Sequence, residues 1–481
     1  MTRTFLRFIV AGLAAVLLSA SGSRHIAAQA GRTPDWTSLN DETLRHFQAL
    51  LRLDTQNPPG NEVLVSDYVK GVLEKEGIPV QIFALDPKRP NLVARLKGSG
   101  SKRPLLYMGH SDVVTVDPAK WIFPPFSATR DGGYIYGRGS LDDRPHIVAG
   151  LMTMLTLKRL NVPLDRDFIF LVESGEEGTT DVGMGFMAKQ HADAIAAEYC
   201  LAEGANTARI DGKVNYASVQ LAEKLPKRIE LVATGPSGHA SRPLQGNAIV
   251  HLSAAVAAAG KWRVPVRLNA TTREFFTRMA SIMPSPEAAR YRALLNPGTK
   301  EADDADAYLL EHDPGYASML RTSISPTIIA GGYRVNVIPS EAKATLDVRM
   351  LPDEDPDQFL AALTRVINDP MVVARYPDIP GEGRPPGRPA RLDSDAFRTI
   401  QAMAMRNYDT VTIPMMGTGA TDMAFTRLLG IECYGIGPAA DLEDAAKGFS
   451  AHSDQERILE REVHRFVRFS YDIVSALAGR N

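Results

Sequence analysis

The sequence predicts a two-domain α/β protein, with a mostly parallel central sheet and a smaller α+β domain inserted into the larger one. The chain has 481 residues, 44% of them hydrophobic and 23% charged, which is more than a single core usually needs. Its early part alternates strand and helix patterns, which is typical of a parallel sheet covered on both faces. Near Lys224 the pattern changes to strands that alternate polar and apolar residues, which indicates a second, half-exposed sheet.

The larger domain is expected to consist of helices and short strands in alternation. Apolar residues at helical spacing predict helices over residues 44–51, 65–72, 142–160 and 184–191. Short apolar runs predict strands over residues 91–96, 105–108, 167–172 and 199–202. The strand over 167–172 is almost entirely apolar, so we expect it to be buried on both faces.

The inserted domain is expected to occupy residues 224–353, which leaves 31–223 and 354–481 to the larger domain. Alternating patterns predict strands over 228–233, 327–330 and 342–350, and an alanine-rich segment predicts a helix over 247–260. The stretch 262–321 is polar and partly helical, without a clear strand. Residues 352–356 are interpreted as the linker back to the larger domain, and the Pro- and Gly-rich residues 377–389 as a surface loop.

Residues 1–30 have the pattern of a secretory signal peptide. Arg3 and Arg7 precede an apolar run over residues 8–20, and Ala28-Gln29-Ala30 offers a small-residue cleavage site. The run is shorter than the roughly 20 residues that span a bilayer, which favours cleavage over an uncleaved anchor. We therefore expect an exported protein, periplasmic or secreted.

Charge and cysteine content exclude several classes of function. The net charge is −2, and it becomes −5 when the first 30 residues, with three arginines and no acids, are removed. A mildly acidic chain without a basic stripe is a poor nucleic-acid binder, so no nucleic-acid partner is expected. Only Cys200 and Cys433 are present, which leaves neither a disulfide framework nor a cysteine-based zinc site. A serine esterase lacks support, because the chain has no Gly-x-Ser-x-Gly elbow.

Acidic residues and histidines recur where the predicted strands end. They are His110 and Asp112 after the strand 105–108, Glu176 and Glu177 after 167–172, Glu203 after 199–202, and Asp142 with Asp143 at the start of the helix 142–160. In an open α/β sheet, ligands bind at the carboxyl ends of the strands. Several carboxylates meeting there repel one another unless a cation neutralises them. Histidine with Asp and Glu, without cysteine, is a ligand set for zinc or a similar divalent ion.

Each cluster taken alone also has a purely structural interpretation. A His-x-Asp sequence is commonly a hydrogen-bonded loop, and an acidic pair such as Glu176-Glu177 is commonly a solvated turn. Asp142 and Asp143 could merely complement the positive end of their helix. Four clusters at strand ends or at an adjoining helix start favour one shared site over four unrelated loops.

Long motifs around these residues resemble metallopeptidase family 20. They are Gly109-His-Ser-Asp-Val-Val114, Trp121 with Pro124-Pro-Phe126, Tyr136-Gly-Arg-Gly-Ser-Leu-Asp-Asp143, Asn336-Val-Ile-Pro339 and Ser450-Ala-His-Ser453. The family includes glutamate carboxypeptidases, acetylornithine deacetylases, succinyl-diaminopimelate desuccinylases, aminoacylases and dipeptidases. The resemblance covers nearly the whole chain after the leader. It implies a zinc-exopeptidase-like main domain and an inserted lid and dimerisation domain.

The resemblance implies a centre of two Zn2+ ions per chain, with Co2+ or Mn2+ as alternatives. Asp142 would bridge the ions, and the other ligands would be His110 and Glu203 on one ion and Glu177 and His452 on the other. Asp112 would accept the second N–H of His110 and so orient its imidazole. Glu176 would be the general base, which takes a proton from metal-activated water and returns it to the leaving amine.

The resemblance also implies substrate-binding residues, most of them in the inserted domain. His239 would help to hold the oxyanion, acting from the neighbouring subunit of a homodimer formed through the lid. Arg349 would grip a substrate carboxylate with its planar fork, and Asn336 would assist. The loop with Gly417 and Thr421 would offer backbone N–H groups to an anion. The plain alternatives are a surface histidine, a surface strand arginine and an ordinary turn.

The expected function is hydrolysis of peptide or N-acyl-amino-acid amide bonds in small substrates with a free carboxylate. In the family, glutamate at the position of Glu203 goes with carboxypeptidase and aminoacylase activity. A dipeptidase and a deacylase of long-chain N-acyl amino acids are the alternatives within this chemistry, and a non-catalytic metal-dependent binding protein is the alternative outside it. Gly175 and Arg144 depart from the family pattern, which usually has an acid and a lysine there.

Overall fold

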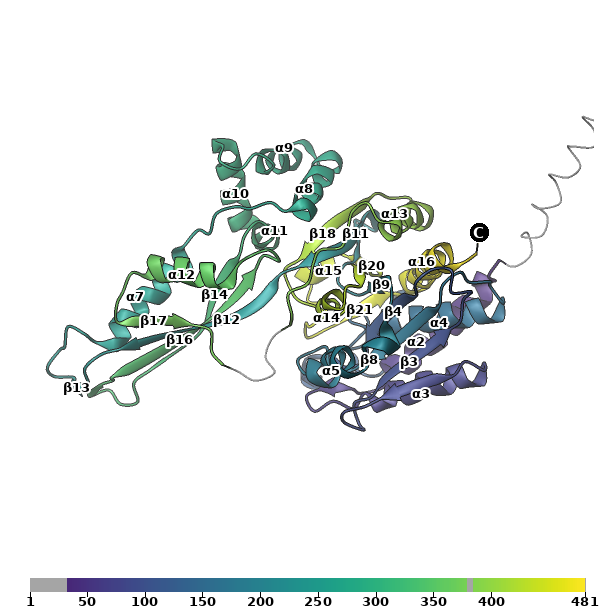
Figure 1. The fold of residues 1–481 in the computed structure, drawn as a ribbon, viewed down its shortest axis with the longest axis horizontal. Coiled ribbons are helices and arrows are strands. Elements are labelled where there is room, and N and C mark those ends of the chain that lie inside the picture. The colour runs from purple at the N-terminus through teal and green to yellow at the C-terminus, as the bar shows by residue number, and fades with distance from the viewer. Residues whose placement is uncertain (1–32, 379–383, 481) are drawn as a thin grey trace, which may run out of the picture.

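A ten-stranded sheet forms the centre of the main domain, on the right in Figure 1. The structure is a computed structural model that describes residues 33–378 and 384–480. The strands lie in the order β2-β3-β8-β4-β9-β19-β11-β10-β20, and β18 pairs with β11. Their bounds are β2 Val80–Phe83, β3 Asn91–Leu96, β4 Leu105–His110, β8 Phe168–Glu173, β9 Tyr199–Ala202, β10 Thr207–Ile210, β11 Lys213–Glu223, β18 Thr412–Gly417, β19 Glu432–Gly435 and β20 Ala439–Asp441.

The central strands run parallel, as the sequence predicts. β4 pairs in parallel with both β8 and β9, and β9 pairs in parallel with β19. All residues of β4, β8 and β9 are buried, because helices cover both faces of the sheet. One face packs against α2 Trp36–Leu51, α3 Val63–Lys75, α4 Arg144–Arg159, α13 Asp395–Tyr408 and α16 Glu460–Ala478, and the other against α5 Met184–Gln190, α6 Ala192–Ile195 and α14 Met423–Leu428.

Smaller elements complete the main domain. A short parallel pair, β1 with β5, adjoins the segment that follows β4, and β21, β7 and β6 form an antiparallel sheet. The bounds are β1 Gln56–Asn57, β5 Val113–Val114, β6 Thr129–Asp131, β7 Tyr134–Tyr136, α15 Glu443–Ala446 and β21 Arg457–Leu459, with 3-10 helices over Pro118–Lys120 and Thr180–Val182.

The lid domain is built on a four-stranded antiparallel sheet in the order β14-β16-β12-β17, on the left in Figure 1. Helices α7 and α12 pack on this sheet, and they share an apolar core with its strands. The bounds are β12 Leu225–Thr234, α7 Ala248–Lys261, β14 Ser323–Gly331, β16 Glu341–Met350, α12 Pro356–Ile367 and β17 Val372–Arg375, with a separate pair of β13 Gly238–His239 and β15 Val337–Ile338.

The lid extends further along the chain than the sequence predicts. β17 pairs with β12 from Glu230↔Arg375 to Ala233↔Val372, so residue 353 is not the end of this domain. The segment 352–356 resembles a linker because of its prolines. Pro356, however, occupies the first turn of α12, where proline is favoured rather than disruptive, and the Asp355 side chain caps that helix.

Residues 262–321 form a cluster of helices that packs on the main domain. The helices are α8 Ala270–Ile282, α9 Ser285–Leu294, α10 Lys300–His312 and α11 Pro314–Met319. Their apolar core contains Phe275, Phe276 and Met279 of α8 together with Tyr216 of β11 and Ile413 and Met416 of β18. This helical insert leaves the lid after α7 and returns to it at β14, yet its apolar face rests on the main domain.

Lys224 joins the main domain, the lid and the helical insert at one point. It is the residue between β11 and β12, and its ammonium group donates to Ser318 O at 2.9 Å and to the hydroxyls of Ser318 and Ser323 at 2.8 Å. Its backbone N–H donates to the carbonyl of Gly417 at 3.0 Å. Lys224 is 1% exposed, and burial, with nearby guanidinium groups, lowers its pKa to about 7.

The buried amine of Lys224 predicts a pH-dependent contribution to stability. Between about pH 7 and its ordinary pKa of 10.5, the unfolded chain binds a proton at this amine that the folded chain has released. The free energy of unfolding of the wild type, minus that of Lys224→Met, should therefore rise with pH across this window. Urea denaturation of both proteins at a series of pH values measures the difference. A difference that stays flat or falls would contradict the prediction.

Two further sequence features concern the chain as a whole. Within residues 33–378 and 384–480, no helix is both long and apolar enough to cross a membrane. The predicted signal peptide, residues 1–30, lies outside the described residues. Cys200 and Cys433 are opposite each other on β9 and β19, and both are buried with free thiols.

Candidate metal centre

The predicted metal ligands come together at the carboxyl edge of the parallel strands. Because β4, β8 and β9 are parallel, their carboxyl ends meet at one edge of the sheet. His110 is the last residue of β4, Glu177 lies in the loop after β8, and Glu203 follows β9. The two remaining ligands, Asp142 and His452, come from the segments that precede α4 and β21.

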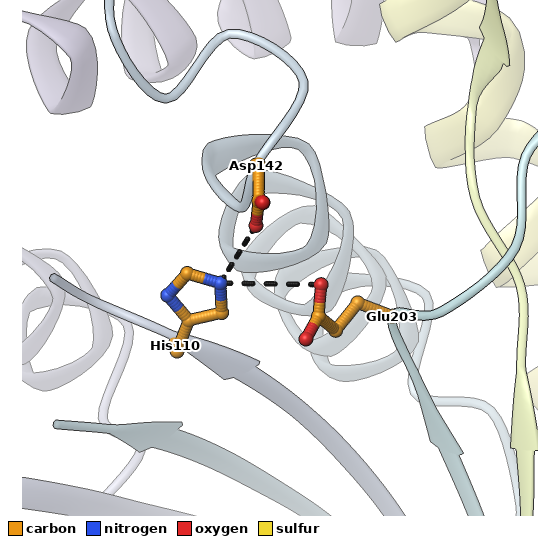
Figure 2. A group of neighbouring side chains, drawn as sticks. All are labelled: His110, Asp142 and Glu203. Carbon is orange, nitrogen blue, oxygen red and sulfur yellow. Dashed lines mark hydrogen bonds and ion pairs between the residues drawn. The ribbon is translucent and has the colours of Figure 1, made fainter. Parts of the chain in front are cut away.

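His110, Asp142 and Glu203 point toward one another in Figure 2. His110 Nε2 lies 2.8 Å from Asp142 Oδ1 and 4.0 Å from Glu203 Oε2. One ligand atom from each residue lies within 4.8 Å of the other two, so a single ion could bind all three after small adjustments. These residues form the first of the two ligand sets that the sequence predicts.

Asp142, Glu177 and His452 form the second set. His452 Nε2 lies 3.2 Å from Asp142 Oδ2 and 2.9 Å from Glu177 Oε1, and the three ligand atoms again lie within 4.8 Å of one another. Asp142 therefore turns Oδ1 toward one set and Oδ2 toward the other. This is the arrangement that a carboxylate bridging two ions requires.

Imidazole–carboxylate pairs balance the negative charge of this cluster. Hydrogen bonds to Asp142 and Glu177 raise the pKa of His452 to about 10. Burial disfavours a charged His110, but the neighbouring Asp112 and Asp142 carboxylates outweigh it and raise that pKa as well. Burial raises the pKa of Glu203, and the charge of Asp142 adds to the shift. Carboxylates this crowded attract a divalent cation, which would displace the protons from the imidazoles.

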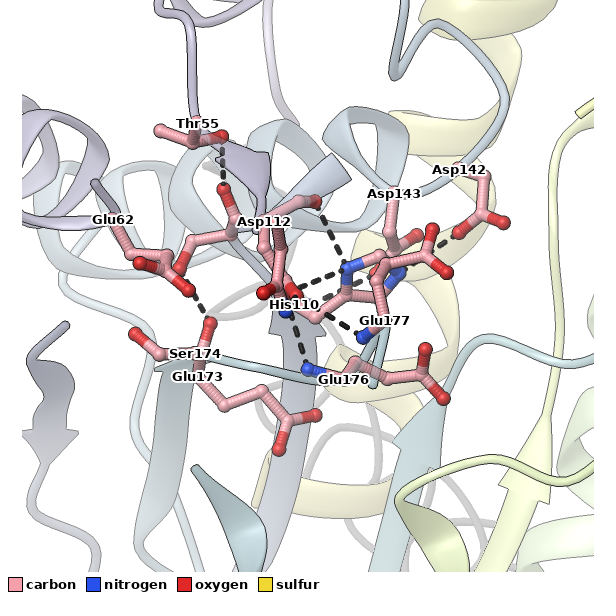
Figure 3. Close-up of polar contacts among 12 residues, drawn as sticks. Thr55, Glu62, His110, Asp112, Asp142, Asp143, Glu173, Ser174, Glu176 and Glu177 are labelled. Atoms are coloured by element: carbon pink, nitrogen blue, oxygen red, sulfur yellow. Dashed lines mark hydrogen bonds and ion pairs between the residues drawn. The ribbon is translucent and has the colours of Figure 1, made fainter. Parts of the chain in front are cut away.

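Asp112 contacts several groups of the site in addition to His110 (Figure 3). Its Oδ1 lies 3.4 Å from His110 Nδ1, and its backbone carbonyl lies nearer, at 3.2 Å. The carboxylate also accepts the backbone N–H groups of Glu176 and Glu177 at 3.1 and 3.0 Å, and the Asn57 amide at 2.8 Å. Burial favours a neutral Asp112, but the hydrogen bonds, that of His110 first, hold its pKa below the usual range.

Glu176 is buried beside the ligands and contacts a residue that the sequence did not single out, Arg384. The Arg384 guanidinium forms an ion pair with the Glu176 carboxylate and donates to its backbone carbonyl at 2.9 Å. It also donates to Ala420 O at 2.9 Å and Asp422 Oδ1 at 3.2 Å. Burial raises the pKa of Glu176 although Arg384 opposes that shift. Arg384 was missed because residues 377–389 have the composition of a surface loop.

Glu176 could also serve as a metal ligand, since its carboxylate forms a third group of possible ligands with His110 and Glu177. Geometry alone therefore leaves it two roles, ligand and general base.

Glu456, another residue that sequence reasoning missed, holds Asp142 in place. Its fully buried carboxylate accepts the backbone N–H groups of Leu141 at 2.6 Å and Asp142 at 3.2 Å. The Arg138 guanidinium balances its charge at 2.8 Å. Its position four residues after His452 was the available signal, because a loop that carries a ligand often carries supporting polar residues as well.

The two departures from the family pattern have structural reasons. Gly175 has a φ of +78°, and a Cβ there would lie 2.5 Å from the carbonyl oxygen of Thr179, so the loop leaves no room for an acidic side chain. Arg144 is fully buried and donates to Ser111 O at 2.7 Å and Thr55 Oγ1 at 2.6 Å. It therefore positions the backbone next to His110 rather than the metal ligands themselves.

His239 and Asn336 lie far from the metal ligands of their own chain. His239 is exposed on β13, at the end of the lid that points away from the main domain in Figure 1. Its Nδ1 accepts the backbone N–H of Ser241 at 3.1 Å. Asn336 lines the same open hollow at the lid tip, next to β15. The structure thus groups these two residues with each other and not with the ligands.

The other predicted substrate residues are engaged in internal contacts. Arg349, on β16, donates to both carboxylate oxygens of Asp347, at 2.9 and 3.1 Å. Thr421 donates its hydroxyl to Glu223 Oε2 at 2.8 Å, and Gly417 accepts from the backbone of Lys224. The end of β18 and the loop that follows it therefore contact the junction between β11 and β12, where the chain enters the lid.

Known proteins are similar to this chain in sequence and in fold. The model for peptidase family M20/M25/M40 matches residues 106–476. A probable succinyl-diaminopimelate desuccinylase of Staphylococcus aureus is 28% identical over 359 residues, which cover 73% of this chain and 78% of that protein. The human protein named N-fatty-acyl-amino acid synthase/hydrolase PM20D1 is 26% identical over 78% of this chain and 74% of its own length.

Among solved structures, the M20 family metallo-carboxypeptidase Sso-CP2 of Sulfolobus solfataricus is similar, with a TM-score of 0.66 at 21% identity. The match covers 90% of this chain and 98% of that one, so the two share the fold of a main domain with a lid. A family model that spans most of the chain leaves a non-catalytic binding protein without support. The chain belongs to peptidase family M20/M25/M40 and is a hydrolytic enzyme of the metallopeptidase and amidohydrolase type.

Proposed function

We propose that the protein is an exported hydrolase with two Zn2+ ions, which cleaves the amide bond of N-acyl amino acids or small peptides that carry a free carboxylate. The observation that carries the metal assignment is the orientation of Asp142, whose two oxygens face two different ligand sets. The donors are His and carboxylate groups, which suit zinc, and Co2+ or Mn2+ are alternatives. Export is proposed from residues 1–30 alone.

The residues around the ligand sets suit proton transfer during hydrolysis. Bound at these ligands, the ions would supply activated water and polarise the substrate carbonyl. Glu176 would take the proton of the attacking water and deliver it to the leaving amine, a task that its raised pKa suits. Asp112 holds the backbone of Glu176 in position, and Arg384 holds its carboxylate.

A substrate carboxylate needs a cation, and Arg349 is our candidate for this role. It would have to exchange Asp347 for the substrate, because its fork is paired in this structure. Hydrolysis of dipeptides remains the alternative reaction. A long-chain deacylase is favoured by a specific observation, the similarity to a protein named for N-fatty-acyl amino acids.

Removal of the metal tests the proposed reaction. Dialysis against a chelator should abolish hydrolysis of N-acyl amino acids and dipeptides, and zinc, cobalt or manganese should restore part of it. Turnover of a panel of both substrate classes, followed with metal analysis of each sample, measures this. Full activity in a sample that contains no metal would refute the two-metal proposal.

Glu176 and Glu177 are neighbours with different proposed roles, which matched substitutions separate. Glu176→Gln should keep about two ions per chain and lower kcat by about 10²–10⁴-fold, the usual scale of general acid–base catalysis. Glu177→Gln should instead lose metal, because it removes a ligand that contacts His452. Metal content by mass spectrometry and kcat are measured on both variants. Equal metal loss in the two would show that Glu176 is a ligand.

We also propose that two chains form a homodimer through their lids. β14 is one of the two edge strands of the lid sheet, and its Ile328 and Ile329 are 61% and 60% exposed. Val250 of α7 is 62% exposed in the same domain. An unprotected edge strand with exposed apolar side chains is suited to pairing with a second copy. In such a dimer, His239 could reach the site of the partner, which it cannot reach in its own chain.

Complementation between inactive variants tests this role of His239. His239→Ala should keep both metals and lose about 2.7–4 kcal/mol of transition-state stabilisation, the usual worth of one oxyanion donor. Mixed with Glu176→Gln, it should regain activity, since one site of each mixed dimer has both residues intact. His251→Ala is the control: it removes another imidazole of the lid, one that pairs with Asp369 and is assigned no part in the reaction, and it should leave activity near that of the wild type. No recovery in verified mixed dimers would show that His239 does not act across an interface.

A further inference from the structure

Two of the candidate metal ligands line a cavity of about 290 Å³ in the main domain. Asp142 and Glu203, which face each other in Figure 2, both line it. From there it extends between the segment after β9, the segment from β19 to β20, α15 and β21. A group that enters this cavity therefore lies next to the reaction centre.

The side chains that line the cavity are mostly apolar. Its apolar residues include Leu141, Ile436, Leu442, Phe449, Ile458 and Leu459. Leu442 is 48% exposed and Ala445 of α15 is exposed, so the wall along α15 reaches the protein surface. A chain longer than the cavity could therefore project outward along this wall.

The charged groups that line the cavity are already paired. Arg457 forks onto Asp444 at 2.7 and 2.8 Å, and its guanidinium stacks between the rings of Tyr134 and Phe449 at 3.9 and 4.0 Å. Asp441 accepts the Tyr134 hydroxyl at 2.8 Å. The other basic lining residue, His146, is bonded to Asp143 and to the carbonyl of Ile436. The lining therefore offers no free cation to a carboxylate.

We infer that this cavity binds the acyl half of the substrate and that the preferred acyl group is an aliphatic chain. The inference rests on the proposed function, in which the free carboxylate belongs to the leaving amine half. Arg457 is held by Asp444 and by two aromatic rings, whereas Arg349 is 35% exposed on the lid and would exchange a single ion pair for the substrate. The carboxylate half is therefore assigned to Arg349, and the uncharged acyl half to the cavity. The acyl half of a dipeptide carries an ammonium group, which needs an acceptor. Asp441 and Asp444, the carboxylates near Arg457, are already engaged by Tyr134 and Arg457. N-acyl amino acids therefore fit this cavity better than dipeptides.

A series of acyl chain lengths tests the assignment. N-acyl glycines from acetyl through hexanoyl to dodecanoyl are measured in two ways: kcat/KM with the metal-loaded wild type, and affinity for the Glu176→Gln variant by calorimetry. Burial of each methylene should raise both quantities about fourfold until the cavity is filled. A flat series while acetyl-glycine is hydrolysed would overturn the cavity assignment and leave the proposed function standing.

Two alanines of α15 give a matched pair of variants. Ala445 lines the cavity and Ala446 does not, although both are exposed on the same short helix. Ala445→Phe should flatten the chain-length series, whereas Ala446→Phe should leave its slope unchanged. Leu442→Asp, which places an unpaired charge in the apolar wall, should weaken the long-chain substrates selectively and guards against a misfolded Ala445→Phe. Equal slopes in all three variants would overturn the inference.

The affinities measured with Glu176→Gln test the inference independently of the proposed function. If no N-acyl amino acid or dipeptide is hydrolysed by the metal-loaded enzyme, the proposed function fails. A chain-length dependence of binding that Ala445→Phe abolishes would still support an acyl-binding cavity in that case. Binding that is independent of chain length in Glu176→Gln would refute the cavity assignment whatever the activity.

Discussion

Asp142 divides its two carboxylate oxygens between His110 and His452, and the arrangement of the site depends on how firmly this carboxylate is held. Its backbone N–H is bonded to Glu456, which comes from the same late segment of chain as His452. On the opposite side, Asp112 fixes both His110 and the backbone of the two glutamates. Two buried carboxylates thus act as anchors for loops from four distant parts of the chain, and each anchor is itself balanced by donors.

The fold and the meeting of the candidate ligands were predictable because both depend on local patterns. Continuous apolar runs such as 167–172 predicted buried parallel strands, and parallel strands place their carboxyl ends together. Residues that follow those strands, such as His110 and Glu203, were therefore expected to meet. The end of the lid was predicted too early, because residues 352–356 have the proline content of a linker. Pro356 in fact starts a helix. Sequence patterns do not distinguish these two uses of proline without the strand pairing of β17.

Residues that act through tertiary contacts could not be found in the same way. Arg384 reaches Glu176 across more than 200 residues of sequence, from a segment whose composition indicates only a loop. Glu456 and Arg144 likewise act through backbone groups of other segments, which carry no side-chain signature. His239 is the reverse case, because a motif pointed to a catalytic role while the position on β13 separates it from its own site. In the dimer that we propose, the site that His239 would serve belongs to the second chain.

The helical insert changes how the lid can move relative to the main domain. A lid joined to the main domain only at Lys224 and by the segment after β17 could rotate about the line through those two connections. The insert adds a support away from that line, because α8 packs on Ile413 and Met416 of β18. Rotation would shear a packed apolar surface or require the segments at each end of the insert to bend. Any rotation of the lid in this enzyme is therefore coupled to a rearrangement of the contact between the helical insert and the main domain.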